Sequence, residues 1–189
     1  MALSDHSPAG GSWLLSTLLV LGALSGSLAS APTRARDVYS AESVKAAFII
    51  RFAGYVTWPE EFLPIVKFTV AVLGAQDLAS NLQNLLAGRA LLNRPVQVRQ
   101  VASVREAADA QILVVGADHR GDLRTLLAPL AGHGVLIVTD EDGGLAAGST
   151  INLLVAEQRV RFEISLEAAR RDHLKISSDL LALAVMVRQ

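Results

Sequence analysis

The sequence predicts an α/β fold: a three-layer α/β/α sandwich around a mixed sheet of about six strands. Between residues 67 and 139, short β-branched or fully apolar runs alternate with leucine-rich helical segments, which is typical of a parallel sheet with helices on both faces. Two alternating runs within residues 150–164 predict a terminal antiparallel hairpin. The chain has 189 residues, 51% of them hydrophobic, which suits one domain with a substantial core.

The first predicted element is a helix over residues 40–57, whose start Ser40 or Ser43 can cap. Pro59 is expected to end it, because the residue before a proline, here Trp58, is disfavoured in the helical region. We expect the Trp58 ring to anchor this helix to the sheet, with the lining of a ligand site as the alternative. Four residues of this stretch are expected to have a structural role and are called the signature residues below: Phe52, Tyr55, Trp58 and Pro59.

The middle of the chain alternates between the two kinds of element. Strands are predicted at residues 67–73, 95–101, 112–115 and 135–139, and helices at 77–86, 103–110 and 120–131. Gly88 follows the first of these helices as a stop signal, and Ser103 with Glu106 forms a capping-box pattern at the second. The run 112–115 is entirely apolar, which indicates the middle of a parallel sheet.

The C-terminal part changes pattern. Strands at 150–155 and 159–164 predict the antiparallel hairpin, and helices are predicted at 166–172 and 177–187. On the second strand, alternation places Arg159, Arg161 and Glu163 on one face and Val160, Phe162 and Ile164 on the other. A charged row of this kind is typical of a solvated face and opposes edge pairing, and the alternative is a docking surface for a protein partner.

Residues 1–31 are expected to be a cleaved signal peptide, with 32–189 as the single mature domain. Residues 13–28 are apolar and uncharged, and the following Ala29-Ser30-Ala31 suits signal peptidase. The run is short for a membrane span of roughly 20 residues. No Lys or Arg precedes it, in contrast to an ordinary signal peptide, so the alternatives are an uncleaved anchor or a misplaced start codon. A signal peptide of this kind predicts an exported protein.

Composition and motifs exclude several classes of function. Removal of residues 1–31 leaves 17 basic and 17 acidic residues, a neutral balance that argues against nucleic acid or an anionic membrane as the main partner. The chain has no cysteine. Its histidines lack metal-ligand spacing, the acidic turn 140–144 lacks the EF-hand pattern, and no nucleotide-binding or nucleophile motif occurs. We therefore expect no catalytic residue, no metal and no cofactor, and a protein that is not an enzyme.

Several segments together resemble the YfiR family of exported bacterial regulators, formerly a domain of unknown function. The resemblance covers the mature chain in order and rests on residues 44–62, 67–74, 108–116, 132–144 and 148–184. It implies a periplasmic α/β domain, often dimeric. Such a domain restrains an inner-membrane diguanylate cyclase by binding its periplasmic sensor region, and so controls cyclic di-GMP and biofilm formation without catalysis.

The resemblance also implies where a partner binds. It points to the C-terminal hairpin and, residue by residue, to Ile151, Phe162 and Glu163. Arg161 is added from strand alternation alone, and Phe162 is expected to pack mainly in the core because it lies on the apolar face. Some family members carry cysteines near positions matching Ala110, Leu145 and Asn152. Because this chain has none, disulfide control is excluded.

A second hypothesis is a small-molecule sensor that feeds a sensor kinase or another membrane signalling protein. Open α/β sheets bind ligands in a crevice at the carboxyl ends of their strands. Here the loops 74–76, 116–119 and 140–144 are expected to line it. The ligand itself is not specified by the sequence.

Overall fold

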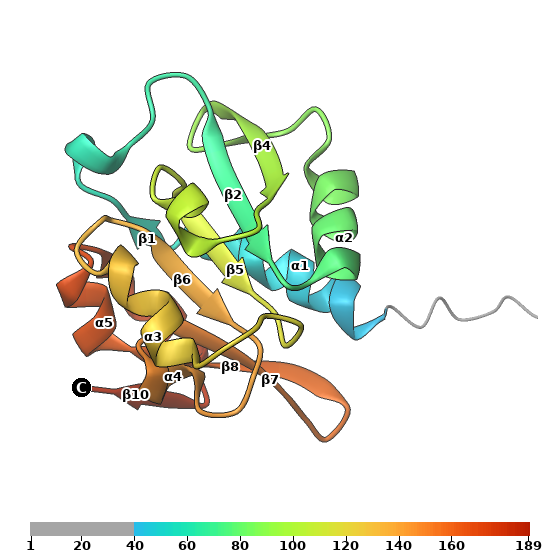
Figure 1. Ribbon diagram of the computed structural model, residues 1–189, viewed down its shortest axis with the longest axis vertical. Coiled ribbons are helices and arrows are strands. Elements are labelled where there is room, and N and C mark those ends of the chain that lie inside the picture. Colours follow the sequence, from blue (N-terminus) through green and yellow to red (C-terminus); the bar gives the residue numbers. More distant parts are fainter. Residues whose placement is uncertain (1–39) are drawn as a thin grey trace, which may run out of the picture. The chain divides into compact units, whose positions relative to one another are not determined.

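An eight-stranded mixed sheet runs through residues 40–189, the part of the chain that the computed structural model describes (Figure 1). The predicted signal segment, residues 1–31, lies outside the described residues. The described residues belong to one compact unit. The strand order in the sheet is β10-β8-β7-β6-β5-β2-β4-β3.

The element bounds are as follows. The strands of the sheet are β2 Phe68–Leu73, β3 Ala90–Leu91, β4 Arg94–Gln100, β5 Ile112–Val115, β6 Leu136–Thr139, β7 Ile151–Ala156, β8 Arg159–Ser165 and β10 Met186–Arg188, and a separate pair is formed by β1 Val56–Thr57 and β9 Lys175–Ile176. The α-helices are α1 Ala41–Phe52, α2 Gln76–Leu86, α3 Leu123–Leu127, α4 Gly144–Ala147, α5 Leu166–Arg171 and α6 Ser178–Leu183, and the 3-10 helices are η1 Glu60–Phe62, η2 Val104–Ala107 and η3 Ala128–Leu130.

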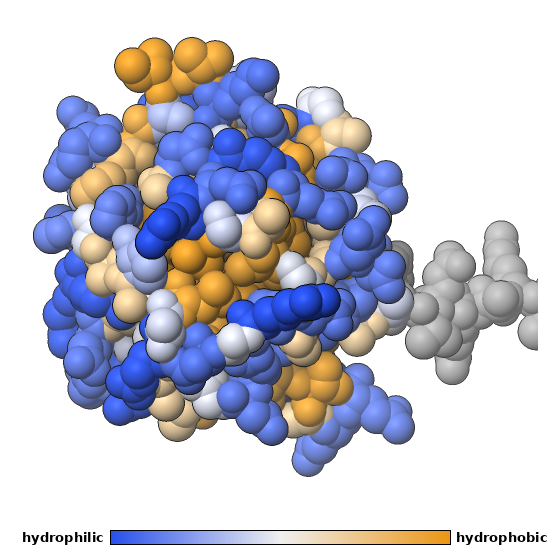
Figure 2. Space-filling model, in the orientation of Figure 1, coloured by the Kyte–Doolittle hydropathy of each residue, from blue (hydrophilic) through white to orange (hydrophobic). Residues whose placement is uncertain are grey.

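Alternation along the central strands divides the core into two clusters, one on each face of the sheet. On β2, Phe68, Val70 and Val72 join the cluster that includes buried residues of α1 and α2. Ala71 and Leu73 join the opposite cluster, with η2, α3 and η3. This arrangement confirms the three-layer sandwich. The layer that contains η2, α3 and η3 is built from short helices. Figure 2 shows an apolar hollow near the centre of the face that this layer covers.

The pairing of strands confirms a parallel core and a C-terminal hairpin. Strands β4, β2, β5, β6 and β7 pair in parallel, whereas β8 is antiparallel to β7. Glu157 and Gln158 link β7 to β8 with φ of 50° and 60°. Two consecutive residues of positive φ are the signature of the tight turn that matches the twist of a hairpin.

The sheet has two strands more than the six expected. Strand β3 is only two residues long and pairs with β4 across Leu92 and Asn93, both of positive φ, so it carries no periodic signal. Strand β10 overlaps the end of the segment predicted as the helix 177–187. The helix α6 ends at Leu183, and residues 186–188 pair in parallel with β8.

The first helix begins as predicted but ends earlier. The Ser40 hydroxyl accepts a hydrogen bond from the Ser43 N–H at 3.2 Å, which confirms the cap. The expectation that Pro59 ends the helix is wrong, because α1 stops at Phe52. The chain turns at once into β1, which pairs with β9, and the Ser177 N–H donates to the Tyr55 carbonyl at 2.9 Å. These long-range hydrogen bonds outweigh the local helical pattern.

Two further helices are shorter than expected. The segment 103–110 forms only the 3-10 helix η2, although Ser103 Oγ does donate to Glu106 Oε1 at 3.0 Å. The segment 120–131 divides into α3 and η3. A proline stands in the first turn of η3, where the N–H that proline lacks would have no partner within the helix. The acidic turn that was expected to be a loop leads directly into α4.

Candidate partner-binding site

Two of the four residues expected to contact a partner lie in the core. Phe162 is 3% exposed, and its ring centroid lies 5.6 Å from that of Phe48 and 5.1 Å from that of Phe52. Ile151 is fully buried, with Val138 of β6 and Ile164 of β8 as its register partners. Neither side chain can touch a partner in this conformation, because both belong to the buried cluster that also contains residues of α1. Their role here is to pack β7 and β8 against α1.

The other two residues are accessible on the opposite face of β8. Arg161 is exposed and Glu163 is half-buried. The Asn152 amide donates to Glu163 Oε1 at 3.0 Å, which fixes the carboxylate across the hairpin. Arg161 makes no ion pair and no side-chain hydrogen bond with any residue of the described range 40–189. Among the described residues, this face of β8 therefore has the Arg161 guanidinium without an intramolecular partner and the Glu163 carboxylate held in one orientation.

A buried polar network lies behind Glu163. Asn152 is 3% exposed, and its Oδ1 accepts from Thr139 Oγ1 at 2.7 Å and from the Glu141 N–H at 3.4 Å. Ser149 Oγ lies 2.9 Å from the same threonine hydroxyl. Buried polar groups of this kind are costly unless each finds a partner. The network therefore couples Glu163 to the end of β6 and to the loop after it.

Glycine is required beside this network. A Cβ atom at Gly144 would collide with Thr139 Oγ1 and lie 2.5 Å from Asn152 Oδ1. Sequence reasoning treated this region as an acidic turn and missed its packing. The available signal was a pair of polar residues, Thr139 and Asn152, at the ends of strands that are otherwise apolar.

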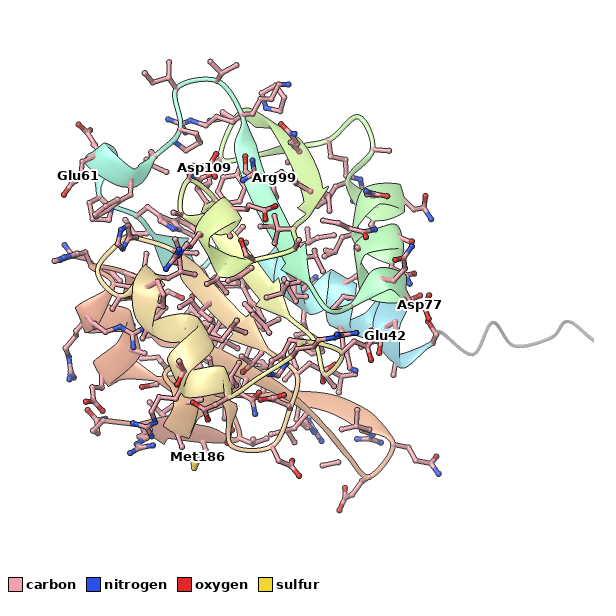
Figure 3. All side chains as sticks on the ribbon, in the orientation of Figure 1. Glu42, Glu61, Asp77, Arg99, Asp109 and Met186 are labelled. Carbon is pink, nitrogen blue, oxygen red and sulfur yellow. The ribbon has the colours of Figure 1, made fainter. Side chains whose placement is uncertain are left out.

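A buried lysine ties α1 to the same loop. Lys45 Nζ lies 2.5 Å from Asp140 Oδ2 and 2.8 Å from Oε1 of Glu42, which Figure 3 labels on α1. Burial lowers the pKa of Lys45, but hydrogen bonds to Asp140 and Glu42 outweigh it, so this pKa lies above its usual range. Burial raises the pKa of Asp140, and the hydrogen bond from Lys45 only partly offsets this. The Lys45 ammonium contacts two carboxylates, so the charged form of the lysine is favoured.

The signature aromatic residues form part of the core. Phe52 is fully buried, and Tyr55 packs against the same apolar cluster. Trp58 is 4% exposed, and its ring stands edge-on to that of Phe68 at 5.6 Å, so it joins the segment after α1 to the start of β2. Pro59 has φ −59° and ψ 151° and caps η1.

The crevice expected at the carboxyl ends of the strands is divided. The Gly74 backbone packs so closely against residues 118–119 that a Cβ atom there would lie 2.5 Å from the His119 nitrogen. The loop 74–76 consequently lines a separate hollow of about 190 Å³, below the usual size of a ligand pocket. His119 instead faces Glu141 at 3.5 Å in a second, wider hollow beside α3. The three loops do not enclose one cavity.

Two further findings concern residues 40–189. No three histidine, aspartate or glutamate side chains in this range are grouped so that they could hold a metal ion. No helix in it combines the length and the apolar character needed to cross a membrane.

Comparison with known proteins gives one family match. The family model described as YfiR/HmsC-like matches residues 42–185 of the chain. The match includes β7, β8 and the loop between β6 and α4.

Two solved structures show only a distant likeness. A conserved domain protein from Vibrio cholerae O1 biovar El Tor str. N16961 has a TM-score of 0.47 and 12% identity, over 78% of this chain and 60% of that one. An ABC domain in complex with L-Trp from Streptococcus pneumonia has a TM-score of 0.42 and 11% identity, over 64% and 55%. The chain thus spans between 55% and 60% of the length of these two structures.

Proposed function

The chain belongs to the YfiR/HmsC-like family, and from this premise we propose that it binds and represses the periplasmic sensor region of an inner-membrane diguanylate cyclase. The family is regulatory rather than catalytic and acts through protein–protein interaction with a sensor partner. In the proposed role the chain is exported by residues 1–31, works in the periplasm as a homodimer, and controls cyclic di-GMP signalling and biofilm formation.

The observation that carries the proposal is the polar face of β8. Arg161 is exposed and unpaired among the described residues, and Glu163 is held by Asn152 on the same face. A guanidinium binds a carboxylate through two parallel hydrogen bonds, and arginine is enriched at interfaces for this reason. A partner surface with an acidic group opposite Arg161 and a donor opposite Glu163 fits this arrangement.

The proposal is tested with the purified periplasmic sensor region of a diguanylate cyclase encoded beside this protein. We expect Arg161→Glu to weaken binding at least about tenfold, because reversal of an interface charge replaces attraction with repulsion. Arg89→Glu is the matched control, because Arg89 is exposed at the opposite edge of the sheet. Equal binding by wild type and Arg161→Glu would exclude this face. Absence of any binding by wild type would exclude that cyclase as the partner.

A second candidate function is small-molecule sensing, as the input of a sensor kinase or another membrane signalling protein. One observation favours it: an arginine-lined pocket on the same side of the sheet as Arg161 and Glu163. Alternation along β8 places Ser165, which lines that pocket, on the same face as these two residues.

A further inference from the structure

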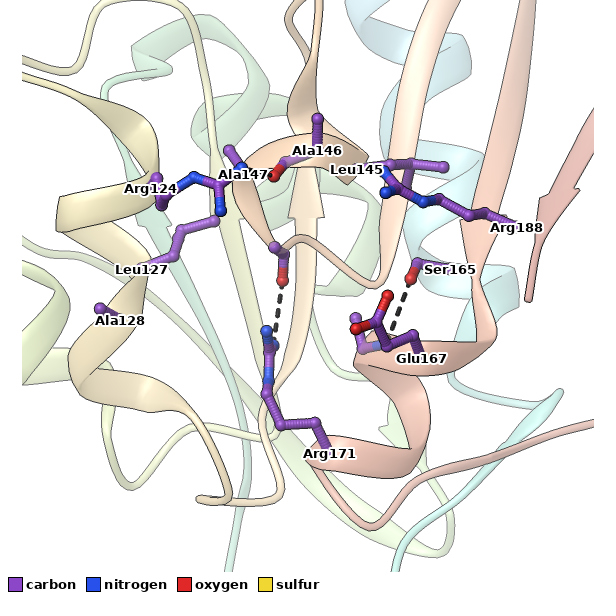
Figure 4. A pocket seen from close by; sticks show the side chains of 12 residues that line it. Arg124, Leu127, Ala128, Leu145, Ala146, Ala147, Ser165, Glu167, Arg171 and Arg188 are labelled. Carbon is purple, nitrogen blue, oxygen red and sulfur yellow. Dashed lines mark hydrogen bonds between the residues drawn. The ribbon is translucent and has the colours of Figure 1, made fainter.

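We propose that the pocket enclosed by α3, α4, α5 and β10 binds a small organic anion that carries one carboxylate and a short apolar group. The pocket has a volume of about 390 Å³, within the range of small-molecule sites. Figure 4 shows side chains from all four elements around it. The residues on which the proposal rests are Arg124, Leu127, Leu145, Glu167, Arg171 and Arg188.

The floor of the pocket is apolar. Leu127 comes from α3, Leu145 from α4 and Ala168 from α5, and each is less than a tenth exposed. Their side chains present methyl groups to the pocket, and the buried Ser165 beside them already accepts a hydrogen bond from the Ala168 N–H. A ligand with an apolar portion covers these methyl groups, whereas an inorganic anion leaves them without a partner.

Two arginines at the rim are held in place by main-chain carbonyls. Arg124 Nη2 donates to the Ala146 carbonyl at 2.6 Å, and Arg171 Nη2 donates to the Gly148 carbonyl at 2.9 Å. Arg171 also donates to both carboxylate oxygens of Asp172, at 2.9 and 2.6 Å. A guanidinium has five N–H donors, so each arginine keeps donors for a ligand while its position is already fixed.

The third arginine comes from the edge strand that the sequence did not predict. Arg188 of β10 stands in register with Ser165 of β8, and both line the pocket. Arg188 has no ion pair within residues 40–189. The fold thus brings together guanidinium groups from residues 124, 171 and 188, which come from separate elements.

The charge balance selects a monoanion. Arg171 pairs with the buried Asp172, Arg124 lies near Asp122, and Glu167 is the one carboxylate among the residues that line the pocket. The charges around the pocket therefore nearly balance, so N–H donors for one carboxylate are present without a surplus of positive charge for a second. A dianion such as phosphate brings a second negative charge that this balance does not neutralise. The chemistry that fits is a short fatty or aromatic monocarboxylate.

The test is an NMR titration of the full-length protein with hexanoate, its neutral isostere hexanamide, and inorganic phosphate. We expect hexanoate to shift the backbone amides of Ala147 and Gly148 with a Kd of about 1 mM, as is typical of a ligand of this size. Hexanamide and phosphate are expected to bind at least about fivefold more weakly, because each lacks half of the recognised chemistry.

Variants that are expected to change hexanoate affinity in opposite directions distinguish an effect on ligand binding from a general change in structure. Arg124→Gln and Arg188→Gln are expected to weaken hexanoate binding about fivefold each, and Glu167→Gln to strengthen it about twofold, because it removes the repelling carboxylate. Arg159→Gln, an exposed arginine at the other end of β8, is the control and should leave binding unchanged. Arg171 is left intact, because its loss would strand the buried Asp172.

Three results would overturn the proposal. The first is the absence of a saturable shift with hexanoate up to about 10 mM, which is tenfold above the expected Kd. The second is binding of hexanamide as tight as that of hexanoate. The third is undiminished hexanoate binding by the Arg124→Gln/Arg188→Gln double variant. No partner protein enters this test, so its outcome is independent of the proposed regulatory function.

Discussion

The two faces of strand β8 have the same backbone but different surroundings. Val160, Phe162 and Ile164 point into the core beneath α1, whereas Arg159 and Arg161 point to solvent on the other face. Glu163 shares the second face and is held by a buried network. One strand therefore contributes to stability through one face and presents charged groups on the other, the face that we propose binds a partner.

This difference separates two kinds of variant. A substitution on the apolar face should lower the free energy of unfolding and change binding only through loss of folded protein. A substitution on the polar face should leave unfolding nearly unchanged and alter binding directly. Residues that support the polar face from behind should affect both.

Phe162→Ala is expected to have the largest effect. Removing a ring that packs between Phe48 and Phe52 should cost about 3–5 kcal/mol of the free energy of unfolding, because it leaves a cavity in the core. Urea denaturation measures this, with Arg159→Ala as a control that should stay within about 0.5 kcal/mol. A cost below about 1 kcal/mol would mean that the apolar face is not a packed core.

Lys45→Met is expected to have the second-largest effect, a loss of about 2–4 kcal/mol of the free energy of unfolding, because it leaves the half-buried Asp140 without its cation. Adding Asp140→Asn should recover much of this loss. The raised pKa of Lys45 means that its contribution is complete below the reference pKa of 10.5 and is lost as the pH rises through the folded-state pKa. The difference in the free energy of unfolding between wild type and Lys45→Met should therefore be constant from neutral pH to about 9.5 and shrink above 10.5. If the losses of the two single variants simply add in the double variant, the pairing of Lys45 with Asp140 is contradicted.

Asn152→Leu tests the network behind Glu163. It removes the acceptor of Thr139 Oγ1 and the donor to Glu163 while keeping the branched shape of the side chain, and should cost about 1–3 kcal/mol of the free energy of unfolding. Because it frees the Glu163 carboxylate to move, binding of the sensor region should also weaken. Chemical denaturation and binding are measured on the same preparation. Unaltered binding despite the loss of stability would show that orientation of Glu163 is irrelevant to the partner.

Arg161→Glu is expected to have the smallest effect on stability, within about 0.5 kcal/mol, because the side chain is exposed and has no partner among the described residues. Thermal unfolding of this variant beside wild type measures the difference. A larger loss would indicate that Arg161 is part of the fold and not of a free surface.

Elements whose residue pattern lies within one segment could be predicted from the sequence. Elements that depend on hydrogen bonds between segments far apart in the chain could not. The strands β5 and β6 were predicted because runs such as 112–115 are apolar on both faces, as a strand covered by two layers must be. The end of α1 and the strand β10 were not, because hydrogen bonds between Ser177 and Tyr55 and between Val185 and Phe162 override local helical patterns.

The candidate site shows the same division. Alternation alone separated the exposed Arg161 from the buried Phe162. The network around Asn152 could not be predicted, because its members come from β6, β7, β8 and the loop after β6 and meet only in the folded sheet. Ile151, inferred from family resemblance, lies between two strands in the core.

The most direct test of the proposed function compares the Kd of the cyclase sensor region for wild type, Arg161→Glu and Arg89→Glu, each at a concentration and temperature where the protein is folded. We expect Arg161→Glu to bind at least about tenfold more weakly, while the control binds like wild type. Equal Kd values for all three proteins would contradict the claim that the polar face of β8 contacts the partner.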